Sequence, residues 1–152
     1  MFPSLQAMVK RGTLNVPVIC VARAGWNLEQ LRARAKDSIE EHGGLDPFAK
    51  LSGLLRYVDG DYSDHATFAV IKKELGAAKR PTHYLAIPPV LFGTVVEQLG
   101  ASGCAKGARV IIEKPFGTDL ASAQEAELDP VLTVCGVVDL PHRPLSRQAA
   151  GE

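Results

Sequence analysis

Residues 16–42, VPVICVARAGWNLEQLRARAKDSIEEH, combine a buried-strand pattern with the amphipathic-helix pattern that directly follows it. The first seven residues are almost all apolar and rich in β-branched side chains, which is typical of a strand covered on both faces. Leu28, Leu31 and Ile39 then recur at helical spacing. Asn27 precedes them as a candidate N-cap. This unit predicts a helix packed on a buried sheet.

The same alternation of strand and helix patterns continues along most of the chain. Further strands are expected at 54–61, 82–89 and 108–114, and further helices at 64–75, 89–103 and 118–128. Strands that alternate with helices predict an α/β fold, here an incomplete Rossmann-like, doubly wound, mostly parallel sheet. The chain opens on a helical pattern at 2–12 with no strand before it. The sheet is therefore expected to lack its first strand.

The composition of the chain excludes several classes of protein. Its 152 residues suffice for about one domain, and its 17 basic residues balance its 17 acidic ones. This balance predicts no nucleic-acid partner, and the lack of a long apolar run predicts no membrane segment and a cytoplasmic location. The three cysteines lack metal-ligand spacing and are expected to be reduced thiols with no metal: Cys20, Cys104 and Cys135.

Candidate ligand-binding residues follow the predicted strands. Open α/β sheets bind ligands outside the carboxyl ends of their strands. Four places in this chain lie at such ends: Arg23, Asp61 with Tyr62, Pro88 with Pro89, and Lys114 with Pro115. The histidines show no spacing typical of a catalytic triad or a metal site, so none is proposed as a base.

Three of these places have two interpretations from the residues alone. Arg23 could hold a phosphate with its guanidinium fork, or it could be a solvated strand end. The rigid pair of Pro88 and Pro89 suits a wall against a flat ring, but it also suits a plain strand-to-helix boundary. Lys114 could donate three hydrogen bonds to a ligand, or it could be structural. The sequence pattern leaves all three alternatives open.

Three longer stretches resemble the glucose-6-phosphate dehydrogenase family. HYLAIPPVLF (83–92) and RVIIEKPFGTDLASAQE (109–125) are similar to segments of its N-terminal coenzyme domain. FPSLQAMVKRGTLNVPVICVARAGW (2–26) resembles the segment just after that family's glycine fingerprint. The resemblance covers residues 1–128. Sugar and inositol dehydrogenases of the glucose–fructose oxidoreductase type share the Glu-Lys-Pro triplet and form the alternative enzyme class.

The resemblance implies a coenzyme, NADP, and a role for each candidate residue. Arg23 would contact the 2′-phosphate of NADP. Asp61 and Tyr62 would line the adenine side of the cleft. Ile87 and Pro88 would lie against the nicotinamide. The preference for NADP over NAD is not fixed by these residues.

Lys114 has the central role that the resemblance implies. It would hold both the nicotinamide region and a hydroxyl of glucose 6-phosphate, positioned by Glu113 and Pro115. The family oxidises carbon 1 of this sugar to 6-phosphogluconolactone, with formation of NADPH, in the pentose phosphate pathway. The family's glycine turn, its phosphate-binding Arg-Ile-Asp-His-Tyr segment and the domain with its catalytic base find no match in this chain. We therefore expect no catalytic residue, an inactive fragment and no family-like homo-oligomer.

The end of the chain departs from the family. Residues 1–128 are predicted to be a partial coenzyme-binding domain and residues 129–152 a divergent, disordered tail. One nucleotide string that encodes residues 140–149 reads Phe-Arg-Ile-Asp-His-Tyr-Arg-Gly-Lys in another frame, close to the missing segment. This suggests the hypothesis of a frameshift between residues 126 and 139. A non-catalytic nucleotide-binding or interaction module is the alternative outside the enzymes.

Overall fold

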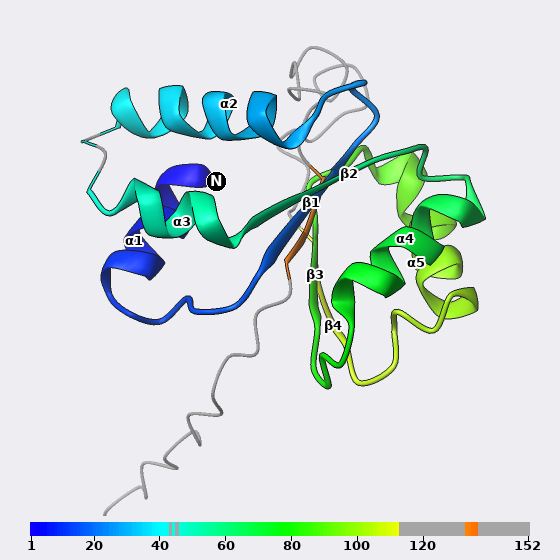
Figure 1. Ribbon diagram of the computed structural model, residues 1–152. Helices are drawn as coiled ribbons and strands as arrows, with labels where there is room; N and C mark the ends of the chain where they lie inside the picture. Colours follow the sequence, from blue (N-terminus) through cyan, green and yellow to red (C-terminus); the bar gives the residue numbers. More distant parts are fainter. Residues whose placement is uncertain (43, 45, 113–132, 137–152) are drawn as a thin grey trace, which may run out of the picture.

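A computed structural model describes residues 1–42, 44, 46–112 and 133–136, the last four by their backbone alone. Helices lie on both sides of a central layer of strands (Figure 1). The helices are α1 (Phe2–Lys10), α2 (Leu28–Glu40), α3 (Phe48–Leu54), α4 (His65–Leu75) and α5 (Phe92–Ala101), with a 3-10 turn η1 (Pro89–Leu91). The strands are β1 (Val18–Ala22), β2 (Leu55–Asp59), β3 (Thr82–Leu85), β4 (Arg109–Ile112) and β5 (Thr133–Gly136).

The strands form two ladders that are parallel as expected. β1 pairs with β2 in parallel, with Val18 opposite Leu55. β3 pairs with β4 in parallel, with Thr82 opposite Arg109. Helices α1, α2 and α3 lie on one side of the strands, and α4 and α5 on the other (Figure 1). The doubly wound, mostly parallel, Rossmann-like architecture is therefore confirmed.

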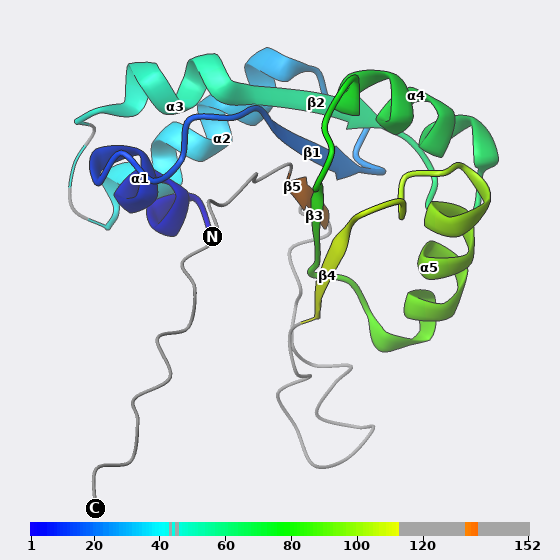
Figure 2. The same ribbon diagram turned by 90° about the horizontal axis from the view of Figure 1, so that it is seen from below.

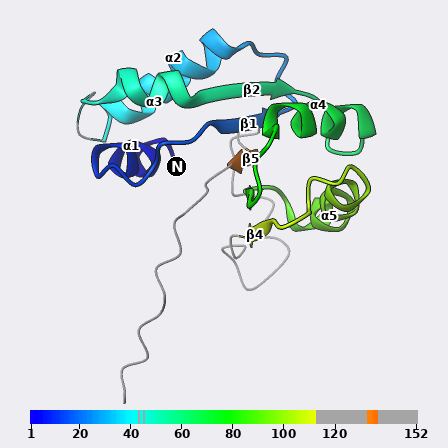
Figure 3. The same cartoon turned by 60° about the horizontal axis from the view of Figure 1, so that its bottom comes forward.

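β5 is the exception to this parallel arrangement. It pairs antiparallel with β1, with Val18 opposite Gly136, and it lies between β1 and β3 (Figures 2 and 3). These four residues form a strand inside the segment 129–152 that was predicted to be a disordered tail, and the division of the chain at residue 128 stays a prediction. The backbone groups on this side of β1 need hydrogen-bond partners inside the fold, and β5 supplies them. The other tail residues lie outside the described part of the chain.

Local sequence signals explain most of the helix boundaries. The Asn27 side chain accepts from the Gln30 amide, and the Gln30 side chain accepts from the Asn27 amide, which makes a reciprocal capping box for α2. Asp64 caps α4 through the amide of Ala66. Helix α3 was not expected, because its seven residues have too short an apolar pattern to reveal a period. The helix predicted at 118–128 lies outside the described residues.

Each face of the sheet carries its own hydrophobic core. Ile19 and Val21 of β1 belong to the cluster under α4 and α5, whereas Val18 and Cys20 belong to the cluster under α1, α2 and α3. All five residues of β1 are buried, as its apolar run predicted. β1 therefore contributes buried side chains to both cores.

The sequence predicted neither a membrane segment nor a metal site, and the described residues can be searched for both. Within them, no helix has both the length and the apolar character that a membrane crossing requires. Nor does any cluster of three or more histidine, cysteine or acidic side chains there suit a metal ion. Cys20 and Cys104 are buried, and neither forms a disulfide bond with another described residue.

Candidate functional site

The carboxyl ends of β1 and β2 bring Arg23 and Asp61 into contact. One guanidinium nitrogen of Arg23 lies 2.9 Å from the Asp61 Oδ2 atom. The Arg23 side chain is 76% exposed and that of Asp61 is 38% exposed, so the pair faces solvent. The sequence rule placed both residues at the ligand-binding edge of the sheet, and the structure shows that they form an ion pair there.

Asp61 is held in place from its own loop as well. The backbone amide of Ser63 donates to Asp61 Oδ1 at 2.9 Å, and the Ser63 hydroxyl donates to the same atom at 2.6 Å. These hydrogen bonds, with a smaller contribution from Arg23, lower the pKa of Asp61. Asp61 is therefore a charged group of fixed orientation at neutral pH.

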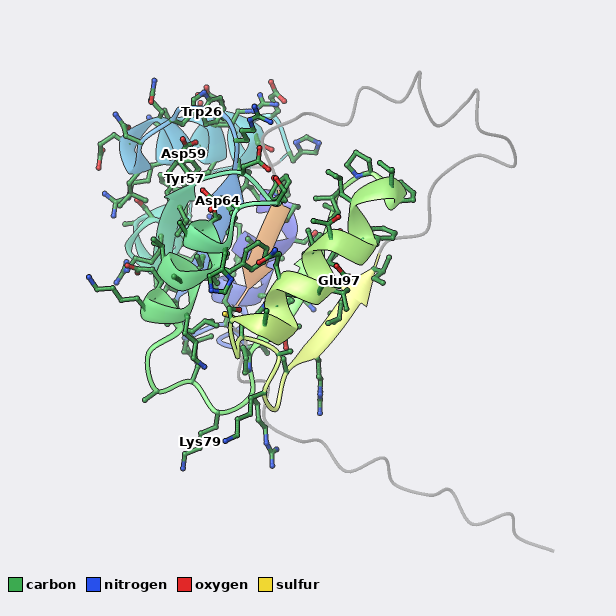
Figure 4. The ribbon with its side chains drawn as sticks, turned by 90° about the vertical axis from the view of Figure 1, so that its right-hand side faces the viewer. Trp26, Tyr57, Asp59, Asp64, Lys79 and Glu97 are labelled. Atoms are coloured by element: carbon green, nitrogen blue, oxygen red, sulfur yellow. The ribbon has the colours of Figure 1, made fainter. Side chains whose placement is uncertain are left out.

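A second carboxylate, Asp59, fastens the turn after β1. Its Oδ1 atom accepts from the amides of Ala24 and Gly25 at 3.2 and 2.8 Å and from the Tyr57 hydroxyl at 2.8 Å. The hydrogen bond from Tyr57 is the largest cause that lowers the pKa of Asp59. Burial and the same bond raise the pKa of Tyr57 to about 12. Figure 4 shows Tyr57 and Asp59 near Trp26, at the end of the molecule opposite Lys79.

Tyr62 folds back onto the end of β1. Its hydroxyl donates to the carbonyl of Val21 at 3.4 Å. Its ring packs against the core cluster under α4 and α5, which also contains Ile87. The structure therefore brings Tyr62 and Ile87 to one region of the fold.

Ile87 and Pro88 differ in what they present at the end of β3. The Ile87 side chain is buried in the core cluster, so only its backbone can line a ligand site. Pro88 is exposed and directly precedes η1. It serves as the strand-to-helix boundary, and its exposed ring leaves a role as a wall open.

The family profile described as glucose-6-phosphate dehydrogenase, NAD binding domain, matches residues 1–133. The chain belongs to the glucose-6-phosphate dehydrogenase family.

Relatives in this family match along most of the chain. It is 37% identical over 126 residues to glucose-6-phosphate 1-dehydrogenase 1 of Mycobacterium tuberculosis, a match that covers 82% of this chain and 27% of that protein. It is 33% identical over 132 residues to glucose-6-phosphate 1-dehydrogenase of Dickeya dadantii, with the same coverage of 82% and 27%. The chain thus spans about a quarter of the length of these relatives.

A solved structure of the family supports the fold. The crystal structure of glucose-6-phosphate 1-dehydrogenase from Mycobacterium avium superposes with a TM-score of 0.72 at 37% sequence identity. The match covers 86% of this chain and 30% of that one. The Rossmann-like arrangement is therefore shared with a coenzyme-dependent dehydrogenase family.

The described histidines are engaged within the fold. His83 is fully buried, and its Nε2 donates to the Cys104 carbonyl at 3.0 Å. Burial lowers the pKa of His83. His42 and His65 hydrogen-bond through Nδ1 to the Ser38 carbonyl and the Gln98 side chain, respectively. That none of these histidines acts as a catalytic base remains a prediction.

Sequence reasoning missed the roles of Tyr57 and Asp59 at the carboxyl end of β2. The signal was available, because Asp59 is the last residue of β2 and Tyr57 lies two residues earlier on the same face. The pattern did not reveal that Asp59 binds the backbone amides of the turn at Ala24 and Gly25. Lys114, with Glu113 and Pro115, lies outside the described residues, so its assignment remains a prediction.

Proposed function

We propose that this chain is the coenzyme-binding part of a glucose-6-phosphate dehydrogenase, with its nucleotide site at the carboxyl ends of β1, β2 and β3. The observation that supports this best is the position of Arg23. Its side chain is 76% exposed directly after the central strand, beside a turn that Asp59 fixes. Doubly wound folds bind dinucleotides at this edge, and an arginine there accommodates the 2′-phosphate of NADP.

The proposed contacts follow the family resemblance and fit the described geometry. Arg23 would hold the 2′-phosphate of NADP through charge-assisted hydrogen bonds. Asp61 and Tyr62 would border the adenine, since both lie at the ends of β1 and β2. The backbone of Ile87 and the ring of Pro88 would face the nicotinamide.

Sugar oxidation itself is proposed for the full-length enzyme. The matched relatives are glucose-6-phosphate 1-dehydrogenases, so glucose 6-phosphate is the proposed substrate. NADP, when bound, accepts the hydride, while the protein binds and orients the reactants. Lys114 is proposed to position the sugar and the nicotinamide. The cytoplasmic location and the lack of a family-like homo-oligomer stay predictions.

Binding of NADP to the 152-residue chain tests this proposal. Replacing Arg23 by Ala is expected to weaken NADP binding roughly tenfold, because a charge-assisted hydrogen bond is lost. Lys79→Ala removes the same charge at the opposite end of the molecule and should leave affinity unchanged (Figure 4). Calorimetric titration measures both. Equal affinities in all three proteins would contradict the proposed site.

A second measurement concerns activity. The 152-residue chain alone is expected not to reduce NADP when glucose 6-phosphate is added, because it corresponds to 27% of the length of its relatives. Absorbance of NADPH reports this directly. Reduction that depends on the sugar would overturn the prediction.

A further inference from the structure

Two groups at the end of β1 can bind an anion: the Arg23 guanidinium and the pair of adjacent backbone amides after it. Each of them already binds a carboxylate of this chain. The Arg23 guanidinium contacts Asp61 at 2.9 Å. The adjacent amides of Ala24 and Gly25 both donate to Asp59. The proposed phosphate site is therefore neutralised by residues from the end of β2 and the loop after it.

The two carboxylates differ in how firmly they are held. Asp59 accepts two backbone amides and the Tyr57 hydroxyl through one oxygen, so it stays in place as part of the turn. The link between Arg23 and Asp61 is an ion pair on the surface, with the arginine side chain 76% exposed. Such pairs add little to stability, so an incoming anion can replace Asp61 at the guanidinium.

A phosphate that reaches Arg23 must compete with Asp61. Ser63 holds the Asp61 carboxylate in its loop through Oδ1, whereas Arg23 pairs with Oδ2. The displaced carboxylate would therefore remain close to the phosphate and repel it. A nucleotide with a free 2′-hydroxyl does not need to break the ion pair and carries no charge at this position.

We propose that Asp61 determines nucleotide specificity by competing with the 2′-phosphate for Arg23, and that this lowers the preference for 2′-phosphorylated nucleotides. The inference rests on the proposed function, because it concerns the same strand-end site. It assigns to Asp61 a role opposite to that of Arg23: the arginine recruits the phosphate, and the aspartate weakens the recruitment.

Asp61→Asn is the direct test. Asparagine retains an acceptor for the two bonds from Ser63 but loses the charge that attracts Arg23. Calorimetry on the full chain should show adenosine 2′,5′-bisphosphate binding about threefold more tightly to the variant, the range expected for loss of an exposed ion pair. Affinity for adenosine 5′-monophosphate should not change. In a chain that also carries Arg23→Ala, the gain should disappear.

Asp64→Asn is the matched control. Asp64 lies in the same loop, and its side chain caps α4 through the amide of Ala66 at 2.9 Å. Asparagine is an equally good N-cap, so this variant removes one negative charge and keeps the fold. It should change the affinity for both nucleotides by less than about twofold. Equal gains in Asp61→Asn and Asp64→Asn would show a general charge effect and overturn the inference.

A titration with inorganic phosphate separates this inference from the proposed function. The NMR signal of the Arg23 guanidinium would report binding of phosphate at that side chain. If no protein binds either nucleotide at millimolar concentration, the proposed function fails. Competition by Asp61 would still stand if Asp61→Asn alone strengthened phosphate binding at Arg23. Identical phosphate binding in the original chain and both variants would overturn it.

Discussion

β1 and β4 have similar apolar sequences but very different surroundings. β1 pairs with β2 on one side and β5 on the other, and all five of its residues are buried. Among the described residues, β4 pairs with β3 alone, and its three apolar side chains are 44 to 50% exposed. An apolar run is enough to make each segment a strand. The position of the strand in the sheet then decides how much apolar surface it buries and so how much it stabilises the fold.

Truncation of one isoleucine in each strand should give the largest contrast. Ile19→Ala is expected to lower the free energy of unfolding by about 3 kcal/mol, because Ile19 is fully buried in a core cluster. Ile111→Ala, at a side chain 47% exposed, should cost less than about 1 kcal/mol. Urea denaturation measures both. Equal losses would mean that β4 is as important to the core as β1.

Two glycines outside the strands extend the contrast. Gly107 precedes β4 with φ +70°, and a Cβ there would lie 2.5 Å from the Lys79 carbonyl oxygen. Gly107→Ala should therefore cost about 2 kcal/mol through strain and overlap. Gly53→Ala, in α3 with open space around it, should stabilise by about 0.5 kcal/mol through helix propensity. Thermal unfolding tests the opposite signs, and a loss at both sites would contradict this account.

Removal of the carboxylate that fastens the turn after β1 should have a smaller, local effect. Asp59→Ala leaves the amides of Ala24 and Gly25 without their acceptor, at an expected cost of about 1 kcal/mol. Hydrogen exchange should become faster at Gly25 while it stays unchanged at Gly76, which is bonded within α4. Unchanged exchange at Gly25 would show that the turn holds its shape without Asp59.

His83 and Asp59 should each make the stability of the fold depend on pH, in two different acidic ranges. Neither should affect stability at neutral pH. Burial lowers the pKa of His83, so below about pH 6.5 the unfolded chain takes up a proton that the folded one resists, and stability falls. The pKa of Asp59 is lowered too, so its contribution is present above about pH 4 and is lost as the pH falls further.

Single variants assign these two pH ranges. His83→Gln keeps a donor for the Cys104 carbonyl and should remove the decrease that begins near pH 6.5. Asp59→Asn should flatten the decrease below about pH 4. Urea denaturation across this pH range is the measurement. A stability profile that neither variant alters would assign acid sensitivity to other groups.

Sequence reasoning predicted the elements well because their signals are local. The apolar run at β1, the spacing of Leu31 and Ile39 and the Asn27 cap all act within one turn or one strand. It also selected the strand ends as the candidate site, and the structure brings Arg23 and Asp61 together there as an ion pair. Sequence reasoning did not find the partners of Asp59, because the amides that donate to this carboxylate lie 34 and 35 residues away along the chain.

The sequence by itself therefore determined an α/β chain of the glucose-6-phosphate dehydrogenase family, with charged residues at the carboxyl ends of its strands. Only the tertiary structure decided that Asp61 pairs with Arg23, that Asp59 fastens the adjacent turn and that β5 lies antiparallel beside β1. The physical reason is that periodicity and capping depend on neighbouring residues, whereas ion pairs and strand partners depend on segments that meet only when the cores assemble.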